Sequence, residues 1–517
     1  MIIIFPLTPQ GCKSLILCGA NGAWWQGSIW KFLKMFMGNK VLLINPPFNI
    51  AKANYDSSVS VGLLSIATYL DAKGVPVKIL DGARQKNFLA ELEREAAQGD
   101  YAGLSVMTTQ LPGALEISRL IRKINPGRKI IWGGAHPTFF PEQTVKHKLV
   151  DIVIVGEGEE TFYEIASGKN LTEIKGILYK EGEKIIVNPR RELCQPAQMP
   201  LFKWELVPPE ILEKLYLIPS LTSRGCPHRC TFCINAILQN RWRARTAEQV
   251  LADLRIIKSK PYFAGKPLRF WDENFFVDFN RAKAIIDGLI TENLNISWET
   301  TVRADYIREG MIGDEFMGKL KKSGCYLLSF GAESGSPAIL AKIKKDIKPE
   351  QIIYSAKQCL KHGIIPQYSF MIGLPGESKP DMLMTLDLID KLIKLSDQVQ
   401  ILGPQAFRPY PGSILYQECL ASGWREPRDL AEWAHLIENE LNYLTVRNFP
   451  WVRHKDFVES MEAYVRFGAH SLKSAMGSSV KAPRLVKLAF VLLCQLRWRL
   501  KFFAWPIEFK LAKRATT

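Results

Sequence analysis

The sequence predicts an α/β protein with two consecutive series of parallel strands and helices, followed by a helical C-terminal region. Short apolar runs alternate with helical patterns through most of the 517 residues, which is typical of parallel sheets. These runs also end repeatedly in Gly, Pro and polar residues, which mark loops. The length allows two to four domains, and a hydrophobic fraction of 47% is ordinary for a globular protein with a large core.

The first series predicts a doubly wound, Rossmann-like sheet. An apolar run at 40–45 suits a strand buried on both faces, and a helix is expected at 62–72. Ligands of such sheets bind at the carboxyl ends of the strands. No Gly-x-Gly-x-x-Gly follows the first strand, so a nicotinamide cofactor is disfavoured. The other strands of this series are expected at 75–80, 101–107, 129–132 and 151–155.

The second series begins after a Pro-rich boundary at 192–209. Its first strand is expected at 215–222, and a helix at 246–258. Each later strand ends in Gly and polar residues, which is where barrel enzymes place their sites. The series ends near Cys419, and a helical region with several Trp and Glu runs from 424 to 468. The later strands are expected at 268–271, 296–301, 326–330, 367–372 and 399–407.

Three cysteines follow the first strand of the second series. Cys226, Cys230 and Cys233 are spaced Cys-x3-Cys-x2-Cys. Three thiolates can hold three irons of a 4Fe–4S cubane, which ordinarily takes four Cys ligands, and they leave the fourth iron open. A structural zinc site usually needs a second pair of ligands, and no second Cys pair at metal spacing exists. A disulfide with a spare thiol is disfavoured because the chain has no clear secretory features.

This cysteine run, with Phe232 before its last thiol, resembles the signature of the radical S-adenosylmethionine (SAM) superfamily. The resemblance implies a partial (β/α)6 barrel, with the cluster on the loop after the first strand. It also implies that SAM caps the open iron through its amino and carboxylate groups. One electron from the cluster then cleaves SAM to a 5′-deoxyadenosyl radical.

The resemblance also assigns SAM contacts to the strand ends. The residues after the second strand match the position that contacts the SAM amino group, although the usual Gly-Gly-Glu is absent. Later strand ends resemble the partners of the carboxylate and ribose, and then the adenine-side loop. The alternative interpretation is that Asp272 and Arg303 form a buried ion pair. The implied SAM-binding residues are Phe232, Asp272, Glu273, Asn274, Arg303, Glu333, Ser334 and Gly373.

The N-terminal half resembles the cobalamin-binding domain that precedes the barrel in one large radical SAM subfamily. The resemblance rests on Asn45-Pro46-Pro47, the helix at 62–70, Gly133-Gly134-Ala-His-Pro and Gly156-Glu-Gly-Glu. A degenerate sheet domain that binds nothing is the alternative. The implied cobalamin-binding residues are Asn45, Pro46, Ser105, Thr108, Thr109, Gly133, Gly134, His136, Gly156, Glu157 and Gly158.

The usual cobalt-ligating histidine of such domains has no counterpart in this sequence. Classical cobalamin domains carry Asp-x-His-x-x-Gly, whereas the equivalent region reads Asp81-Gly-Ala-Arg-Gln. The resemblance therefore implies that no histidine holds the lower face of cobalt there. His136 is the nearest other candidate, and a loop histidine with structural partners is the alternative.

The basic character of the chain lies mostly in its two ends. The formal net charge is +17, of which residues 1–40 carry +4 and residues 481–517 carry +8. In the C-terminal tail, Arg and Lys alternate with Leu, Phe and Trp, and the uncharged stretch is shorter than the ~20 residues that span a bilayer. This pattern predicts either a helix lying on an anionic membrane surface or a terminal helix packed on the barrel. Nucleic-acid binding is disfavoured, since no binding module is recognisable.

Together these resemblances imply a cobalamin-dependent radical SAM enzyme, similar to the hopanoid-biosynthesis and anaerobic magnesium-protoporphyrin ester cyclase subfamily. Residues 1–37 are expected to be an extension, 38–195 the cobalamin domain, 210–420 the barrel and 421–517 the helical region. The enzyme would methylate, cyclise or otherwise remodel a hydrophobic small molecule, with a flavodoxin- or ferredoxin-like reductant. We expect a cytoplasmic protein, peripheral at the inner membrane surface if the tail binds lipid. A radical SAM enzyme acting on RNA and a non-catalytic sensor are the alternatives.

Overall fold

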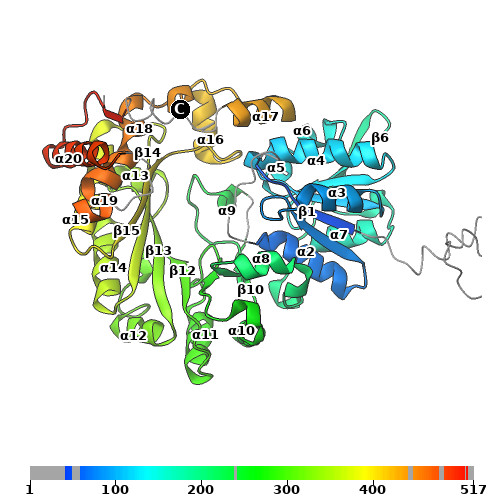
Figure 1. Ribbon diagram of the computed structural model, residues 1–517, viewed down its shortest axis with the longest axis horizontal. Coiled ribbons are helices and arrows are strands. Elements are labelled where there is room, and N and C mark those ends of the chain that lie inside the picture. The colour runs from blue at the N-terminus through cyan, green and yellow to red at the C-terminus, as the bar shows by residue number, and fades with distance from the viewer. Residues whose placement is uncertain are drawn as a thin grey trace, which may run out of the picture.

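The computed structural model describes residues 41–48, 59–237, 241–439, 446–476, 483–506 and 508–509. The extension expected at 1–37 lies outside the described residues. Two large sheets dominate the fold, and each carries helices packed against it (Figure 1). The first sheet spans the chain up to Val187, and the second begins at Ile218. The cartoon shows the two sheet domains side by side, with the N-terminal domain in blue and cyan.

The N-terminal sheet has seven strands in the order β2-β1-β3-β4-β5-β6-β7. The first five strands are parallel, as predicted, while β6 and β7 add an antiparallel hairpin that the sequence analysis missed. Alternate residues of β1 join different cores, because helices cover both faces of the sheet. The strands are β1 (Val41–Asn45), β2 (Val77–Asp81), β3 (Tyr101–Ser105), β4 (Lys129–Gly133), β5 (Ile152–Ile154), β6 (Ile177–Glu181) and β7 (Lys184–Val187).

Within the described residues 61–166, six helices accompany this sheet. The predicted helix at 62–72 is confirmed as α2, which packs against α7. The helices are α2 (Val61–Ala72), α3 (Phe88–Ala96), α4 (Leu111–Ile124), α5 (Ala135–Phe139), α6 (Pro141–Lys146) and α7 (Glu159–Ala166).

The second sheet has six parallel strands in chain order, from β8 at one edge to β15 at the other. The two edge strands do not pair with each other, so the described strands form an open arc, as expected for a partial barrel. All six predicted strands are confirmed, with ends that differ by a few residues. They are β8 (Ile218–Ser220), β11 (Leu268–Phe270), β12 (Trp298–Val302), β13 (Cys325–Glu333), β14 (Ile365–Ile372) and β15 (Gln400–Ala406).

Several helices of the second domain begin at side-chain caps that the sequence supplies. Thr246 and Gln249 form a capping box at α10, and Ser378 and Asp381 form one at α15. The helices are α8 (Pro209–Lys214), α9 (Ile234–Ile237), α10 (Ala247–Ser259), α11 (Phe279–Thr291), α12 (Asp314–Lys322), α13 (Pro337–Lys342), α14 (Pro349–Lys361), α15 (Lys379–Ile393) and α16 (Ile414–Ala421). A short antiparallel ribbon of β9 (Ser223–Arg224) and β10 (Arg243–Ala244) flanks the cysteines.

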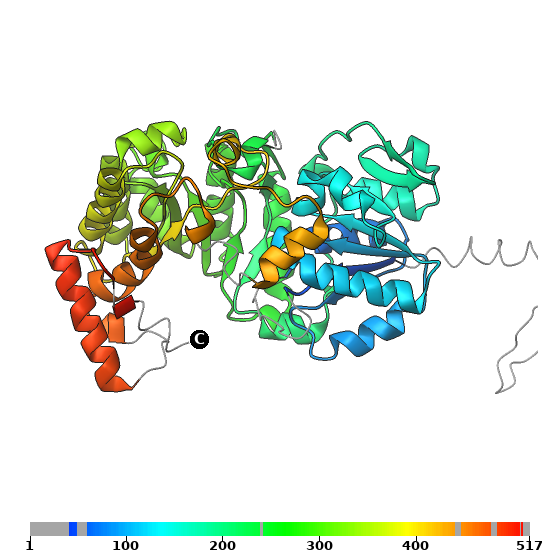
Figure 2. The same cartoon turned by 90° about the horizontal axis from the view of Figure 1, so that it is seen from above.

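The C-terminal helices divide between the two domains. α17 (Leu430–Asn439) returns to the N-terminal domain and packs on α4, with Trp433 and Ile437 in the core of that domain. Figure 2 shows this amber helix beside the cyan ones, apart from the red and orange helices. The helices on the barrel side are α18 (Lys455–Tyr464), a π-helical segment at Val465–Ala469, α19 (Leu472–Met476) and α20 (Arg484–Leu500).

Candidate active site

The three cysteines line one cavity at the carboxyl ends of the barrel strands. Cys226, Cys230 and Cys233 share this cavity of about 310 Å³, and Cys230 is buried. No group of three His, Cys, Asp or Glu side chains in the described ranges lies close enough to hold a single metal ion. Three thiols that line one cavity suit a 4Fe–4S cubane, because a cubane spreads its ligands over several irons.

Asp272 braces the base of the cysteine loop and does not line the cavity. Its carboxylate is buried and accepts hydrogen bonds from Thr222 N at 2.7 Å, Thr222 Oγ1 at 2.5 Å and Ser223 Oγ at 2.6 Å. The alternative of an ion pair between Asp272 and Arg303 is wrong, because Arg303 bonds to Asp305 instead, at 2.9 Å. The structure thus places Asp272 behind the site, where it orients the strand that leads to Cys226.

Two buried cations face the same cavity. The Arg303 guanidinium donates to the carbonyl oxygen of Lys345 at 2.7 Å, and Lys345 Nζ lies 2.9 Å from Glu333 Oε1. Burial opposes the charge of Lys345, but the Glu333 carboxylate and Cys230 hold its pKa above the usual value. Lys345 Nζ also lies 6.0 Å from the centroid of the Phe232 ring. Sequence reasoning missed Lys345, since only folding brings the loop after α13 to the cysteines.

Glu333 is held in a strained backbone conformation at this cavity. Its φ is +63°, and the register between β13 and β14 shifts at this residue. A non-glycine residue in the left-handed region costs energy and is found most often at functional sites. The shift turns the Glu333 side chain toward Lys345, as the ion pair at 2.9 Å requires.

Of the other predicted SAM contacts, some line the cavity and some do not. Phe232, Glu273 and Asn274 line it, and Asn274 Nδ2 donates to the Tyr306 hydroxyl at 3.2 Å. Ser334 is buried against Thr385 at 3.0 Å and lies outside the cavity. Gly373 also lies outside, where its N–H donates to Glu377 and its carbonyl accepts from Trp451.

His228 lines the cavity, and its ring contacts Tyr306. Its Nε2 lies 2.9 Å from the Tyr306 hydroxyl. Burial and the nearby Arg303 lower the pKa of His228 to about 4. The imidazole is therefore neutral at ordinary pH, and it acts here as a hydrogen-bonding partner of Tyr306.

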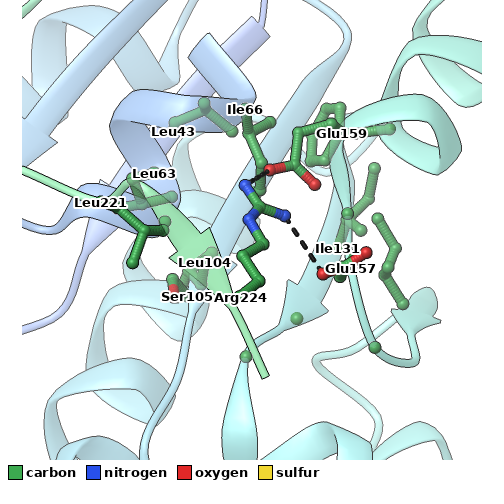
Figure 3. A pocket seen from close by; sticks show the side chains of 18 residues that line it. Leu43, Leu63, Ile66, Leu104, Ser105, Ile131, Glu157, Glu159, Leu221 and Arg224 are labelled. Carbon is green, nitrogen blue, oxygen red and sulfur yellow. Dashed lines mark hydrogen bonds and ion pairs between the residues drawn. The ribbon is translucent and has the colours of Figure 1, made fainter. Parts of the chain in front are cut away.

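A second pocket, of about 230 Å³, opens at the carboxyl edge of the N-terminal sheet (Figure 3). Its walls are apolar, from Leu43, Ile66 and Phe162 among others, and glycines form its rim. Gly134 has φ +98°, and a Cβ there would lie 2.8 Å from Val106 N, so only glycine fits. This cradle suits a flat nucleotide base with a phosphate tail. The predicted residues that line it are Ser105, Gly133, Gly134, Gly156, Glu157 and Gly158.

Five predicted cobalamin contacts lie outside this pocket. Asn45 Nδ2 donates to Asp81 Oδ1, and the Pro46 carbonyl accepts from Gln110. These bonds tie the end of β1 to Asp81 and the loop after it to Gln110. The remaining residues lie on the turn after β3 and at the start of α5, and they are Thr108, Thr109 and His136.

His136 sits in an aromatic cluster and does not face the pocket. Its ring centroid lies 5.1 Å from Phe140 and 5.6 Å from Trp433, and Nδ1 lies 3.2 Å from Thr108 Oγ1. Burial lowers the pKa of His136 to about 3. The structure thus favours the alternative of a structural loop histidine over a ligand of cobalt.

This burial predicts acid sensitivity. The unfolded chain binds a proton on His136 below about pH 6.5 and the folded chain does not until about pH 3, so stability falls as pH drops through this window. At pH 5 the loss attributable to His136 is about 2 kcal/mol. We expect His136→Phe to make the denaturation midpoint less dependent on pH between 6.5 and 4. The exposed His454→Asn serves as control, and an unchanged slope in His136→Phe would contradict this assignment.

Arg224 of the barrel domain enters the glycine-rimmed pocket, as Figure 3 shows. It lies on β9, two residues before Cys226. Its Nη2 donates to Glu159 Oε1 at 2.6 Å and to Ser65 Oγ at 2.9 Å. Sequence reasoning missed this contact, because an arginine beside the cysteine motif does not reveal which distant carboxylate it meets.

Comparison with known families divides the chain in the same way as the two sheets. The family model described as B12 binding domain matches residues 48–166, and that described as Radical SAM superfamily matches residues 220–389. The first range contains most of the glycine-rimmed pocket, and the second contains the three cysteines.

Individual relatives agree with these matches. An uncharacterised methyltransferase of Pyrococcus horikoshii is 30% identical over 397 residues, which cover 74% of this chain and 83% of that protein. An anaerobic magnesium-protoporphyrin IX monomethyl ester cyclase of Rubrivivax gelatinosus is 22% identical and covers 73% and 70%. The structure of the radical SAM methyltransferase TsrM from Kitasatospora setae, with cobalamin and a [4Fe-4S] cluster bound, shares the fold. Its TM-score is 0.62 at 15% identity, covering 93% of this chain and 100% of that chain.

Proposed function

Because the chain belongs to the family of radical SAM enzymes with a B12-binding domain, we propose that it methylates or otherwise remodels an unactivated carbon of a hydrophobic substrate. The family's cofactors are a 4Fe–4S cluster, SAM and cobalamin. When bound, these supply an electron, a carbon radical and a transferable methyl group. The observation that carries the proposal is the pair of cavities at the strand ends of two adjoining sheets, linked by Arg224.

The side chains divide among the cofactors by their chemistry. Cys226, Cys230 and Cys233 would hold the cluster. Glu273 and Asn274 offer acceptors to an amino group, while Arg303 and Lys345 offer donors to a carboxylate. Asn274, Arg303 and Lys345 are buried, which excludes water and strengthens such contacts. The glycine rim of the second pocket would admit the nucleotide tail of cobalamin.

A lipid- or tetrapyrrole-like substrate is supported by three exposed apolar side chains, two of which follow strand ends. Met107 follows β3, Trp271 follows β11 and Leu402 lines the cysteine cavity, and each is at least 45% exposed. The cyclase of Rubrivivax gelatinosus takes its name from a porphyrin ester. Like other radical SAM enzymes, the protein requires a reductant, and we propose a flavodoxin or ferredoxin.

The test is anaerobic reconstitution with iron, sulfide and hydroxocobalamin, followed by reduction in the presence of SAM. We expect cobalamin to co-purify and 5′-deoxyadenosine to appear in mass spectra. Methylcobalamin-dependent methylation of added tetrapyrroles or polyprenoid lipids would identify the substrate class. A protein that forms its cluster but never binds cobalamin would overturn the proposal.

Two other functions are less well supported. RNA-modifying methylthiotransferases resemble this chain in the barrel, but their N-terminal domain carries its own cluster cysteines, and residues 38–165 contain no cysteine. The match to a B12-binding domain covers the same region. A non-catalytic sensor would not cleave SAM, and the relatives compared above carry the names of enzymes.

We also propose that α20 docks on an anionic membrane surface. Val491, Cys494 and Trp498 pack it on the barrel domain, with Trp498 Nε1 donating to Asp390 at 2.9 Å. The opposite face repeats apolar residues at helical spacing and carries no acidic residue. None of the described helices is long and apolar enough to cross a bilayer. The outward side chains are Leu485, Val486, Leu492, Leu493, Leu496 and Leu500, followed by Phe502 and Trp505.

The membrane proposal predicts binding to anionic vesicles. Arg484, Lys487 and Arg499 lie on the same helix, so binding should combine apolar insertion with attraction to acidic lipids and weaken in salt. We expect the protein to sediment with vesicles of phosphatidylcholine and phosphatidylglycerol, and the double variant Leu492→Glu, Leu496→Glu to bind at least tenfold more weakly. The matched control is Val187→Glu, an exposed apolar position on β7. Equal binding of the double variant would refute the assignment.

A further inference from the structure

Arg224 connects the glycine-rimmed pocket to the loop that carries the three cysteines. Its guanidinium lies in the first domain, on Glu159 and Ser65, while its backbone belongs to β9. Glu159 is 4% exposed, and Ser65 Oγ donates to the same Glu159 oxygen at 2.6 Å. A buried carboxylate with two fixed donors holds the arginine in one geometry.

The residues beside Arg224 are fixed to the other domain. Thr222 and Ser223 bond to Asp272 at the end of β11. Gly225 follows with φ +82°, and Cys226 comes next. The strand that precedes the cysteine loop is thus held by the barrel on one side and by the glycine-rimmed pocket on the other. A change in the contacts of Arg224 is therefore expected to alter the backbone conformation at the start of the cysteine loop.

At the polar edge of the glycine-rimmed pocket, acidic and basic side chains are equal in number. Two carboxylates, Glu157 and Glu159, face two guanidinium groups, Arg224 and Arg243. Arg243 is held on Glu157 by two contacts of 3.0 Å. Arg224 is shared among Glu159, Ser65 and, at 3.3 Å, Glu157. The nucleotide tail of cobalamin carries one phosphodiester anion, and two carboxylates without Arg224 would repel it.

We propose that Arg224 is a positioning residue that couples the two cofactor sites. Arg224 would pair with the phosphodiester of the tail in place of part of its contact with Glu159, and this pairing would fix the start of the cysteine loop. The coupling is reciprocal: an assembled cluster raises the affinity for cobalamin, and bound cobalamin alters the surroundings of the cluster. This inference rests on the proposed function, since it requires both cofactors.

The test uses the full-length protein and two readouts other than activity. Hydroxocobalamin binding is titrated by visible absorbance, and the EPR signal of the reduced cluster is recorded with and without cobalamin. The variants are Arg224→Gln, Arg224→Lys and Glu159→Gln. Arg255→Gln is the matched control, because Arg255 lies on the surface of α10 and forms an ion pair with Glu292, away from both cavities.

Wild type should bind cobalamin and show a changed cluster signal on binding. Arg224→Gln should bind about tenfold more weakly and lose that spectral response at an unchanged iron content, while Arg224→Lys recovers part of the affinity. Glu159→Gln should bind more tightly, since one competing carboxylate is gone; a merely structural network would weaken binding instead. Arg255→Gln should match wild type.

Three results decide between the explanations. The coupling is overturned if Arg224→Gln keeps the cobalamin affinity and the cluster response of the wild type. It is also overturned if Glu159→Gln binds cobalamin more weakly than the wild type. If Arg224→Gln does not fold, the sign of the change in Glu159→Gln decides the question. A wild-type protein that binds no cobalamin would overturn the proposed function itself, which separates that failure from a failure of the coupling.

Discussion

Cys230→Ala is expected to abolish the iron–sulfur cluster and all cleavage of SAM. Cys230 is the most buried of the three thiols that line the cavity, at 8% exposed. Two remaining thiolates cannot complete a site that already lacks the usual fourth ligand. Iron content and the visible absorbance of the reconstituted protein should fall to background. 5′-Deoxyadenosine should become undetectable, a loss of several orders of magnitude.

Cys359→Ala is the matched control for this experiment. Cys359 is a buried thiol on α14 that does not line the cavity, so its loss should cost about 1–2 kcal/mol of stability through packing alone. Iron content and SAM cleavage should match wild type. A full cluster in Cys230→Ala, or cluster loss in Cys359→Ala, would refute the assignment of the ligands.

Much of the fold could be predicted because buried parallel strands leave continuous apolar runs in the sequence. The run at 40–45 became β1, with both faces in a core. The hairpin of β6 and β7 was missed although Gly182 and Glu183 between two short β-prone segments are a hairpin signal. The return of α17 to the N-terminal domain left no such signal, since an amphipathic helix does not specify its neighbour.

Some residues of the site could likewise be predicted from local sequence, whereas others depend on long-range contacts. The cysteines are spaced within eight residues, so one loop carries their chemistry and the sequence reveals it. Lys345 and Arg224 reach their sites only through tertiary contacts with Glu333 and Glu159. Asp272 was placed at the correct strand end, but the direction of its side chain depends on the hydroxyls of Thr222 and Ser223. Strand-end position predicts proximity to a site and not the orientation of each side chain.

Asp272→Ala is expected to lower the stability of the barrel domain by about 3 kcal/mol or more, because it leaves three buried donors without an acceptor. Arg281, which donates to Thr222 Oγ1 at 2.7 Å, also loses its nearby counter-charge. The strand before Cys226 should then loosen, so iron content should fall together with the denaturation midpoint. Both quantities can be measured on the same purified variant.

Asp272→Asn separates the bracing role from direct contact with SAM. An amide keeps one acceptor for Thr222 N, and the two hydroxyls can turn to accept from its NH2 group, so the loss should be only about 1 kcal/mol with the cluster retained. If Asp272 instead bound the SAM amino group, as the family resemblance implied, both variants would keep a full cluster and normal stability while the affinity for SAM fell. Asp314→Asn, at an exposed ion pair with Lys361, should change neither the stability nor the cluster content. A stable Asp272→Ala protein with a complete cluster would therefore restore the direct role and reject the brace.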